Sequence, residues 1–204
     1  MTINGTLCRR QALGHLGALA LALQTQIAQI AHAANTKPEQ TLPGDSVYQL
    51  QVPLTDQQGK AFELGFAQGL PLFVSMFYSS CDMVCPALFA TINMTLQALP
   101  TAQRKKLRVL MVSFDPQRDT VAVLQQAFQA HSLDEHWTLA RTDDANARKL
   151  AAVLGLQYRR LASGEFNHSS TVLLLDAQGR IKARSGQLGH TDPAMVAAAR
   201  KLAS

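Results

Sequence analysis

The chain has 204 residues, of which 47% are hydrophobic and 16% are charged. This balance supplies enough apolar material for the core of one domain and excludes an intrinsically disordered chain. The formal net charge is +5, but the basic residues are scattered, and their longest run is Arg104–Lys105–Lys106. Nucleic-acid binding requires a wider basic patch with aromatic or polar readers, so we expect no nucleic-acid partner.

The first 33 residues have the pattern of a secretory signal peptide. Arg9 and Arg10 precede a Leu/Ala-rich stretch from 12 to 23, and Ala31–His32–Ala33 offers a small-residue cleavage site. We therefore predict an exported protein, periplasmic or otherwise extracytoplasmic, from which residues 1–33 are removed. An uncleaved anchor that attaches the N-terminus to the inner membrane is the alternative, although the apolar stretch is shorter than the roughly 20 residues of a bilayer span.

Residues 34–45 contain several polar, Pro and Gly residues, which predicts a linker before a single domain over residues 46–204. Cleavage would remove Cys8 and two arginines, leaving 17 basic against 14 acidic residues and a formal charge of +3. The mature chain would keep Cys81 and Cys85, which can form a disulfide in an oxidising compartment. Because the closed loop would be very short, stabilisation is a weak reason for this pair, and chemistry at a site is a better one.

The domain begins with two β-rich runs, 47–54 and 61–64, around the turn sequence at 56–59, which predicts a β-hairpin. The apolar run at 72–77 predicts a buried strand, and helical sequence follows from 84 to 99.

Strands and helices alternate through the rest of the chain. We predict a strand at 107–114, a helix capped by Asp119–Thr120 and running to 130, a strand at 136–140, a helix opened by Asp143–Asp144 and stopped by Gly155, a β-hairpin formed by 170–176 and 180–184, and a final helix at 194–202. This order predicts a small α/β domain with a mixed sheet.

Cys81 and Cys85 lie between the predicted strand at 72–77 and the helix that follows. The unpaired amide donors and the positive dipole end of a helix start favour the thiolate, which is the form that attacks disulfides and binds metals. A spacing of four places both sulfurs on one face of a helical turn. There they can chelate one ion or, after local adjustment, form a disulfide.

Two thiolates are an incomplete metal site, so we expect a third ligand from a histidine. His168 is the best candidate, because a loop that enters the strand at 170–176 can approach the helix end with the cysteines. Two thiolates and one imidazole suit Cu(I), Cu(II) or Zn(II), and this set does not choose among them. We expect His131, His136 and His190 to be surface residues, with His190 as a weaker candidate for a secondary metal contact.

Four segments of the sequence together resemble the Sco/SenC family of thioredoxin-like proteins. They are FYSSCDMVCP at 77–86, SFDPQRDT at 113–120, Trp137 with GLQY at 155–158, and NHS at 167–169 with LDAQG at 175–179. The resemblance implies a thioredoxin-like fold, in which helices flank a central mixed β-sheet that has an N-terminal β-hairpin. It also implies a copper site made by Cys81, Cys85 and His168, with one Cu(I) or Cu(II) per chain.

The resemblance further implies a metallochaperone that delivers copper to, or reduces the cysteines of, the CuA centre of a respiratory oxidase. Its partners would be an apo copper-centre protein such as an oxidase subunit, and a copper donor or thiol reductant. The alternative is a thiol–disulfide oxidoreductase that uses Cys81 and Cys85 as a catalytic redox pair on other proteins. Asp82–Met83 stand where many members of the family have Pro-Asp, which puts the oxidase-specific partner in question.

Three charged residues of the segment at 113–120 are expected to be structural. We predict that Asp115, Arg118 and Asp119 form a network that braces the loop beside the cysteines, and take no part in catalysis.

Overall fold

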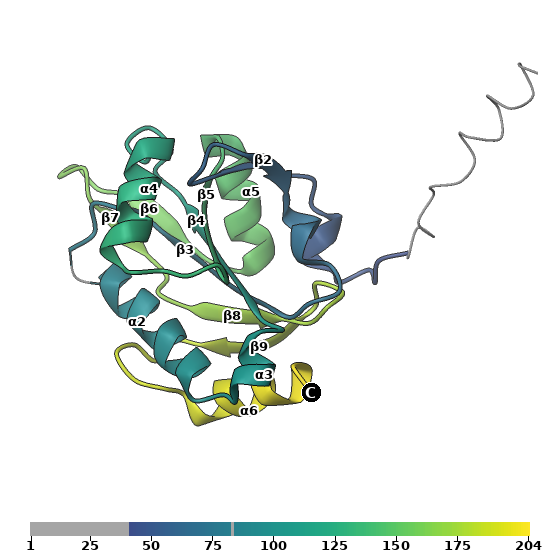
Figure 1. The fold of residues 1–204 in the computed structure, drawn as a ribbon. Coiled ribbons are helices and arrows are strands. Elements are labelled where there is room, and N and C mark those ends of the chain that lie inside the picture. Colours follow the sequence, from purple (N-terminus) through teal and green to yellow (C-terminus); the bar gives the residue numbers. More distant parts are fainter. Residues whose placement is uncertain (1–40, 83) are drawn as a thin grey trace, which may run out of the picture. The chain divides into compact units, whose positions relative to one another are not determined.

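The computed structural model describes residues 41–82 and 84–204 (Figure 1). The predicted signal segment at 1–33, Cys8 and most of the predicted linker lie outside the described residues. Leu42–Ser204 form one compact unit. Among the described residues, no helix combines the length and the apolar character that a membrane span requires.

A mixed seven-stranded β-sheet forms the centre of this unit, in the order β2-β1-β5-β4-β3-β8-β9 (Figure 1). The neighbours β3, β4 and β5 run parallel, whereas β1 and β2 form an antiparallel hairpin, and β8 and β9 form a second one. The strands are β1 Pro53–Asp56, β2 Ala61–Glu63, β3 Leu72–Phe77, β4 Arg108–Ser113, β5 Trp137–Arg141, β8 Val172–Leu175 and β9 Ile181–Ser185.

The core lies on both faces of the neighbouring strands β4, β3 and β8. Every residue of β3 and β8 is buried, and so is every residue of β4 after Arg108. Such continuous apolar runs are expected for strands that are covered on both faces, and each fully buried large side chain contributes about 1.5–3 kcal/mol. The central strands therefore form a rigid base for the loops at their ends.

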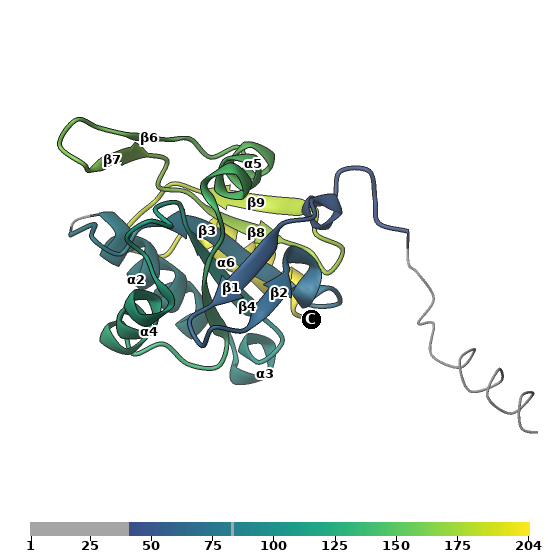
Figure 2. The same cartoon turned by 90° about the horizontal axis from the view of Figure 1, so that it is seen from above.

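Helices cover both faces of the sheet (Figure 2). Right-handed crossovers place α2 and α4 on one face, since β3, β4 and β5 follow one another in the same direction across the sheet. Figure 2 shows α5 on the opposite side, and α6 packs against α2, β8 and β9. The helices are α2 Val84–Gln97, α3 Thr101–Arg104, α4 Val121–Ala130, α5 Asp144–Leu154 and α6 Pro193–Leu202.

Local capping residues fix the helix ends near the site. Thr120 accepts a hydrogen bond from the Val123 amide at the start of α4, and Asp143 accepts one from the Asn146 amide at the start of α5. Gly155 ends α5 with a φ of +65°, a left-handed conformation that glycine adopts without steric cost.

The thioredoxin-like α/β fold with an N-terminal β-hairpin is confirmed, with two local corrections. Residues Val47–Gln49 form a 3₁₀ turn, and β1 begins only at Pro53. A separate antiparallel hairpin, β6 Tyr158–Arg160 with β7 Phe166–His168, was not predicted. Its strands have three residues each and are largely polar, so they lack the hydrophobic alternation that marks a strand.

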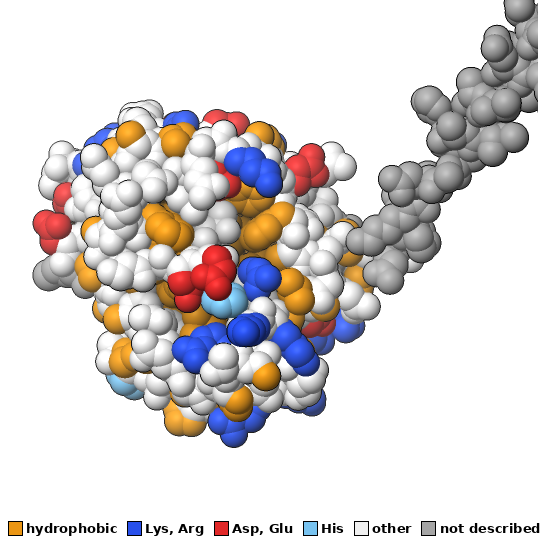
Figure 3. Space-filling model, viewed as in Figure 1, with side chains coloured by type: hydrophobic (Ala, Val, Ile, Leu, Met, Phe, Trp, Pro, Cys, Tyr) orange, Lys and Arg blue, Asp and Glu red, His pale blue; other side chains and the backbone are white. Residues whose placement is uncertain are grey.

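On the face that Figure 3 shows, several Lys and Arg side chains gather near one histidine, and others lie further apart. In Figure 3, these side chains lie next to acidic, apolar and uncharged ones.

Candidate metal centre

Cys81 and Cys85 lie in the turn between β3 and α2. Cys85 is the second residue of α2, and its amide donates a hydrogen bond to Sγ of Cys81 at 3.3 Å. The first amides of a helix have no partner within the helix, so this contact uses a donor that the fold leaves available. Both residues are present as thiols; Cys81 is 9% exposed, and Cys85 lies deeper at 3%.

The expectation that the helix start favours the thiolate is wrong for Cys85. Burial raises the pKa of this thiol, and the nearby Cys81 sulfur and Asp119 carboxylate raise it further, whereas a backbone hydrogen bond from Tyr78 opposes them only in part. Desolvation is the largest of these effects, and it favours the protonated thiol. A metal ion reverses the balance, because coordination deprotonates a thiol directly.

His168 lies at the end of β7, and not in a loop as the sequence predicted. It pairs with Tyr158 across the β6–β7 hairpin. Its Nδ1 is 3.1 Å from the carbonyl oxygen of Ser169. Since a carbonyl only accepts, Nδ1 must carry the proton, and Nε2 is left as the ligand atom.

The structure brings these three residues together, although His168 lies 83 positions after Cys85 in the sequence. One ligand atom from each of Cys81, Cys85 and His168 lies within 4.8 Å of the others. In a trigonal site, metal–ligand bonds of about 2.0–2.3 Å place the ligand atoms roughly 3.5–4.0 Å apart, so an inward movement of about 1 Å at most completes a three-coordinate site. Within the described residues, no further His, Cys, Asp or Glu joins this group.

The donor set by itself still does not exclude zinc, because zinc sites with two cysteines, one histidine and an open fourth position occur. Structural zinc sites use four protein ligands in a tetrahedron. Two soft sulfurs and one imidazole in a compact triangle match the ligand preference of copper. The residues present therefore fit a copper ion.

Solvent reaches this group through two hollows. One, of about 410 Å³, is lined by Tyr78, Cys81, Glu165 and His168 among others. The other is a wider groove of about 850 Å³ between the end of α5 and the β6–β7 hairpin, and His168 borders it too. The imidazole is thus the part of the group that both openings share.

Comparison with known families decides what kind of protein this is. Residues 42–204 match the SCO1/SenC family. The chain belongs to this family. Comparison with curated proteins gave no significant match.

Solved structures support the same fold. Bradyrhizobium japonicum ScoI with copper bound is similar at 25% identity and a TM-score of 0.65, over 75% of this chain and 98% of that one. A SCO1/SenC family lipoprotein from Bacillus anthracis is 21% identical, with a TM-score of 0.68 over 76% of this chain and 94% of that one. A putative electron transfer protein from Aquifex aeolicus is 23% identical, with a TM-score of 0.66 over 79% and 91%.

Among the described residues, the three other histidines lie outside this group, and two of them, which were predicted to be surface residues, are partly buried. His131 is partly buried and stacks on Phe89, with ring centroids 4.1 Å apart. The side chain of His136 is 11% exposed, and its Nδ1 is 3.3 Å from a guanidinium nitrogen of Arg108. His190 is exposed and contacts Gln187, so it adds no ligand to the group.

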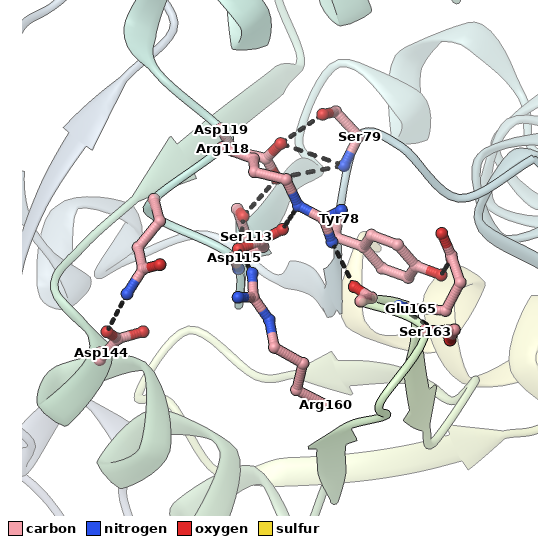
Figure 4. A network of polar contacts seen from close by, with 12 residues as sticks. Tyr78, Ser79, Ser113, Asp115, Arg118, Asp119, Asp144, Arg160, Ser163 and Glu165 are labelled. Carbon is pink, nitrogen blue, oxygen red and sulfur yellow. Dashed lines mark hydrogen bonds and ion pairs between the residues drawn. The ribbon is translucent and has the colours of Figure 1, made fainter.

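The predicted bracing network is present, and Asp119 holds the turn with the cysteines. Its carboxylate is 1% exposed and accepts hydrogen bonds from the Ser79 amide at 3.1 Å, from the Ser79 hydroxyl and from the Ser113 hydroxyl at 2.5 Å (Figure 4). Ser79 is two residues before Cys81, so Asp119 fixes the start of the cysteine turn.

Two members of the network were missed by sequence reasoning. Arg160 forms an ion pair with Asp115 at 2.8 Å, and Tyr78 donates a hydrogen bond to Glu165 at 2.6 Å (Figure 4). These partners are 45 and 87 residues apart in the chain. No local pattern predicts such pairs, since they meet only once the hairpin has folded onto the sheet.

Proposed function

We propose that this SCO1/SenC protein binds one copper ion per chain through Cys81, Cys85 and His168. It delivers the copper to an apo copper-centre protein, such as a subunit of a respiratory oxidase. The grouping of two thiols and one imidazole within 4.8 Å carries the proposal. Family membership and the likeness to a ScoI structure with copper bound support it.

The site is suited to holding copper that must later leave. Cys85 anchors it from the buried side, while Cys81 and His168 line the hollows through which a partner thiol or imidazole can approach. Transfer then requires only the exchange of ligands one at a time. Three ligands leave room for such an incoming group, which a closed four-coordinate site would not.

A competition titration tests the copper site. The reduced protein is titrated with Cu(I) under anaerobic conditions against a coloured chelator. We expect one copper per chain, and His168→Ala should weaken the affinity at least about tenfold, since it removes one of three ligands. His190→Ala, which removes an exposed histidine elsewhere, is the matched control and should bind as the wild type does. Equal affinity of His168→Ala and wild type would reject the three-ligand site.

Thiol–disulfide exchange is the second candidate function, and the unequal burial of the two cysteines favours it. Cys81 lines a hollow and can attack a partner disulfide, and Cys85 behind it can then resolve the mixed disulfide. In this reaction the two protein thiols become a disulfide and the partner disulfide becomes two thiols.

The two functions separate at His168. Copper delivery depends on the imidazole, whereas exchange depends on the sulfurs alone. If His168→Ala loses copper transfer to an apo oxidase copper domain but still reduces its disulfide at the wild-type rate, the protein has both activities. If it retains full assembly activity in cells, reduction is the function and metal delivery is wrong.

We also propose an extracytoplasmic location, on the basis of the predicted signal segment at 1–33. A fusion of residues 1–45 to alkaline phosphatase, which is active only after export, tests this. Cleavage and membrane anchoring are then distinguished by the size of the mature protein and its recovery in the soluble fraction.

A further inference from the structure

The hairpin that carries His168 is not part of the main sheet. β6 and β7 pair only with each other, whereas the cysteine turn is attached directly to β3 and α2. The imidazole of the metal group therefore lies on the separate hairpin, whereas its two sulfurs lie at the end of the main sheet. The contacts that hold the hairpin against the sheet decide whether the imidazole stands within reach of the sulfurs.

The strongest of these contacts is centred on Asp115, in the loop after β4. Its carboxylate is 2% exposed and is bound by two guanidinium groups, that of Arg118 through Nε and that of Arg160 through Nη2 at 2.8 Å. Arg160 belongs to β6, so this ion pair ties the first strand of the hairpin to the loop (Figure 4). Arg118 also donates to the Gly164 carbonyl at 2.8 Å, which ties the hairpin turn.

We call Asp115, Arg118 and Arg160 the clamp, because their contacts hold the hairpin against the loop after β4. The buried Asp115 carboxylate is stabilised by both charged partners, and without Arg160 it would keep its ion pair with Arg118. The guanidinium groups of Arg118 and Arg160 lie 5.8 and 5.2 Å from the ring centre of Phe166 in β7, within the range of a cation–π contact. One carboxylate thus fixes both strands of the hairpin through two arginines.

A second tie comes from the cysteine side. Tyr78 follows β3 and donates to Glu165 in the hairpin turn, and its ring meets the His168 ring edge-on at 5.8 Å. Tyr78 is also three residues before Cys81. Tyr78 therefore links the β6–β7 hairpin to the segment that carries Cys81.

We propose that Asp115, acting through Arg118 and Arg160, is the positioning device that holds His168 at the copper site. The inference rests on the proposed copper site. The segment at 113–120 thus serves both parts of the metal group: Asp119 holds the cysteine turn, and Asp115 holds the hairpin. None of the three clamp residues belongs to the group of candidate metal ligands.

Arg160→Met tests the clamp, because Arg160 is 45% exposed and its loss leaves the core intact. Arg159→Met is the matched control, since it removes the same charge from the next residue of the same strand. Among the described residues, the side chain of Arg159 forms no ion pair or hydrogen bond with Asp115, Arg118 or Arg160. We expect Arg160→Met to weaken Cu(I) binding about tenfold, as the loss of groups that orient a metal ligand does, and Arg159→Met to change it less than twofold.

Two further readouts separate positioning from a general loss of stability. Pulsed EPR of the Cu(II) form detects coupling to the imidazole nitrogen, which should weaken in Arg160→Met but not in Arg159→Met. Hydrogen exchange of the metal-free protein should be faster over 158–168 in Arg160→Met alone. In a His168→Ala background, Arg160→Met should have no further effect on copper affinity, since there is no imidazole left to position.

The outcomes distinguish this inference from the proposed function. If the wild type binds no copper, the proposed function fails, and faster exchange over 158–168 still establishes the clamp. If the wild type binds copper through His168 but Arg160→Met keeps its affinity, its nitrogen coupling and its slow exchange, the clamp is wrong and the copper site stands. An equal loss of affinity in the two arginine variants would also overturn the clamp, because it would show a charge effect.

Discussion

Asp119→Ala should be among the most destabilising single changes near the site. The Asp119 carboxylate is almost fully buried and satisfies three donors: the amide and hydroxyl of Ser79 and the hydroxyl of Ser113. Alanine leaves the partly buried Ser79 amide without its acceptor and opens a space beside the cysteine turn.

The structure sets the expected size of this effect. An unsatisfied buried donor costs about 1–3 kcal/mol, and hydrogen bonds to a charged group are worth about 1.5–3 kcal/mol each. The two serine hydroxyls can turn to other acceptors, so we count mainly the amide and expect a loss of about 3 kcal/mol. Asp119→Asn keeps one acceptor oxygen and should lose roughly half of that. Since a typical domain has only about 5–15 kcal/mol of stability, either change is measurable.

Urea unfolding of the reduced protein measures this loss as a shift of the midpoint at constant slope. Asp143→Ala is the control, because Asp143 also accepts from a backbone amide, but at the exposed start of α5. That variant should lose about 1 kcal/mol, the usual value for a helix cap. The reasoning is refuted if Asp119→Ala loses no more stability than Asp143→Ala.

Three other predictions follow from single positions. Gly179→Ala should lose about 2 kcal/mol of unfolding free energy, since its Cβ would lie 2.6 Å from the Tyr48 ring. Gly69→Ala, where φ is also positive but an added Cβ would meet nothing within 4 Å, should lose only about 1 kcal/mol. Equal urea midpoints of the two variants would contradict this. Burial lowers the pKa of His131, so the folded state resists protonation, and stability should fall as the pH drops below the unfolded value of about 6.5. His131→Phe keeps the stacking and should show a smaller fall between about pH 7.5 and 5.5; an unchanged fall would be evidence against a buried neutral ring. Because burial raises the pKa of Cys85, copper must displace its proton, and the apparent Cu(I) affinity should rise with pH between about 6 and 8, whereas a flat profile would mean that the thiol is already ionised.

Most of the fold could be predicted because its signals are local. The bounds of α5 follow from Asp143 as the cap and Gly155 as the left-handed stop, and β3 is a run of apolar residues that only a buried strand explains. The β6–β7 hairpin has no such signal. Its strands are held by the Asp115 clamp and by aromatic packing from Phe114, both of which come from elsewhere in the chain.

The three residues of the candidate metal group could be proposed from the sequence, but their geometry could not. Cys81 and Cys85 stand out through their spacing at a helix start, and His168 through the resemblance to Sco/SenC proteins. The location of His168 on a strand, and the imidazole tautomer that its contact with Ser169 sets, depend on the fold around the hairpin. The pKa of Cys85 was mispredicted because its burial depends on packing that the sequence alone does not reveal.

X-ray absorption spectroscopy of the Cu(I)-loaded protein tests the central claim most directly, because it counts the atoms bound to the metal. The account predicts two sulfur ligands and one imidazole nitrogen, at bond lengths of about 2.3 and 2.0 Å respectively. His168→Ala should lose the nitrogen and keep both sulfurs. A copper ion bound by the two sulfurs alone in the wild type, or by sulfurs of two different chains, would contradict it.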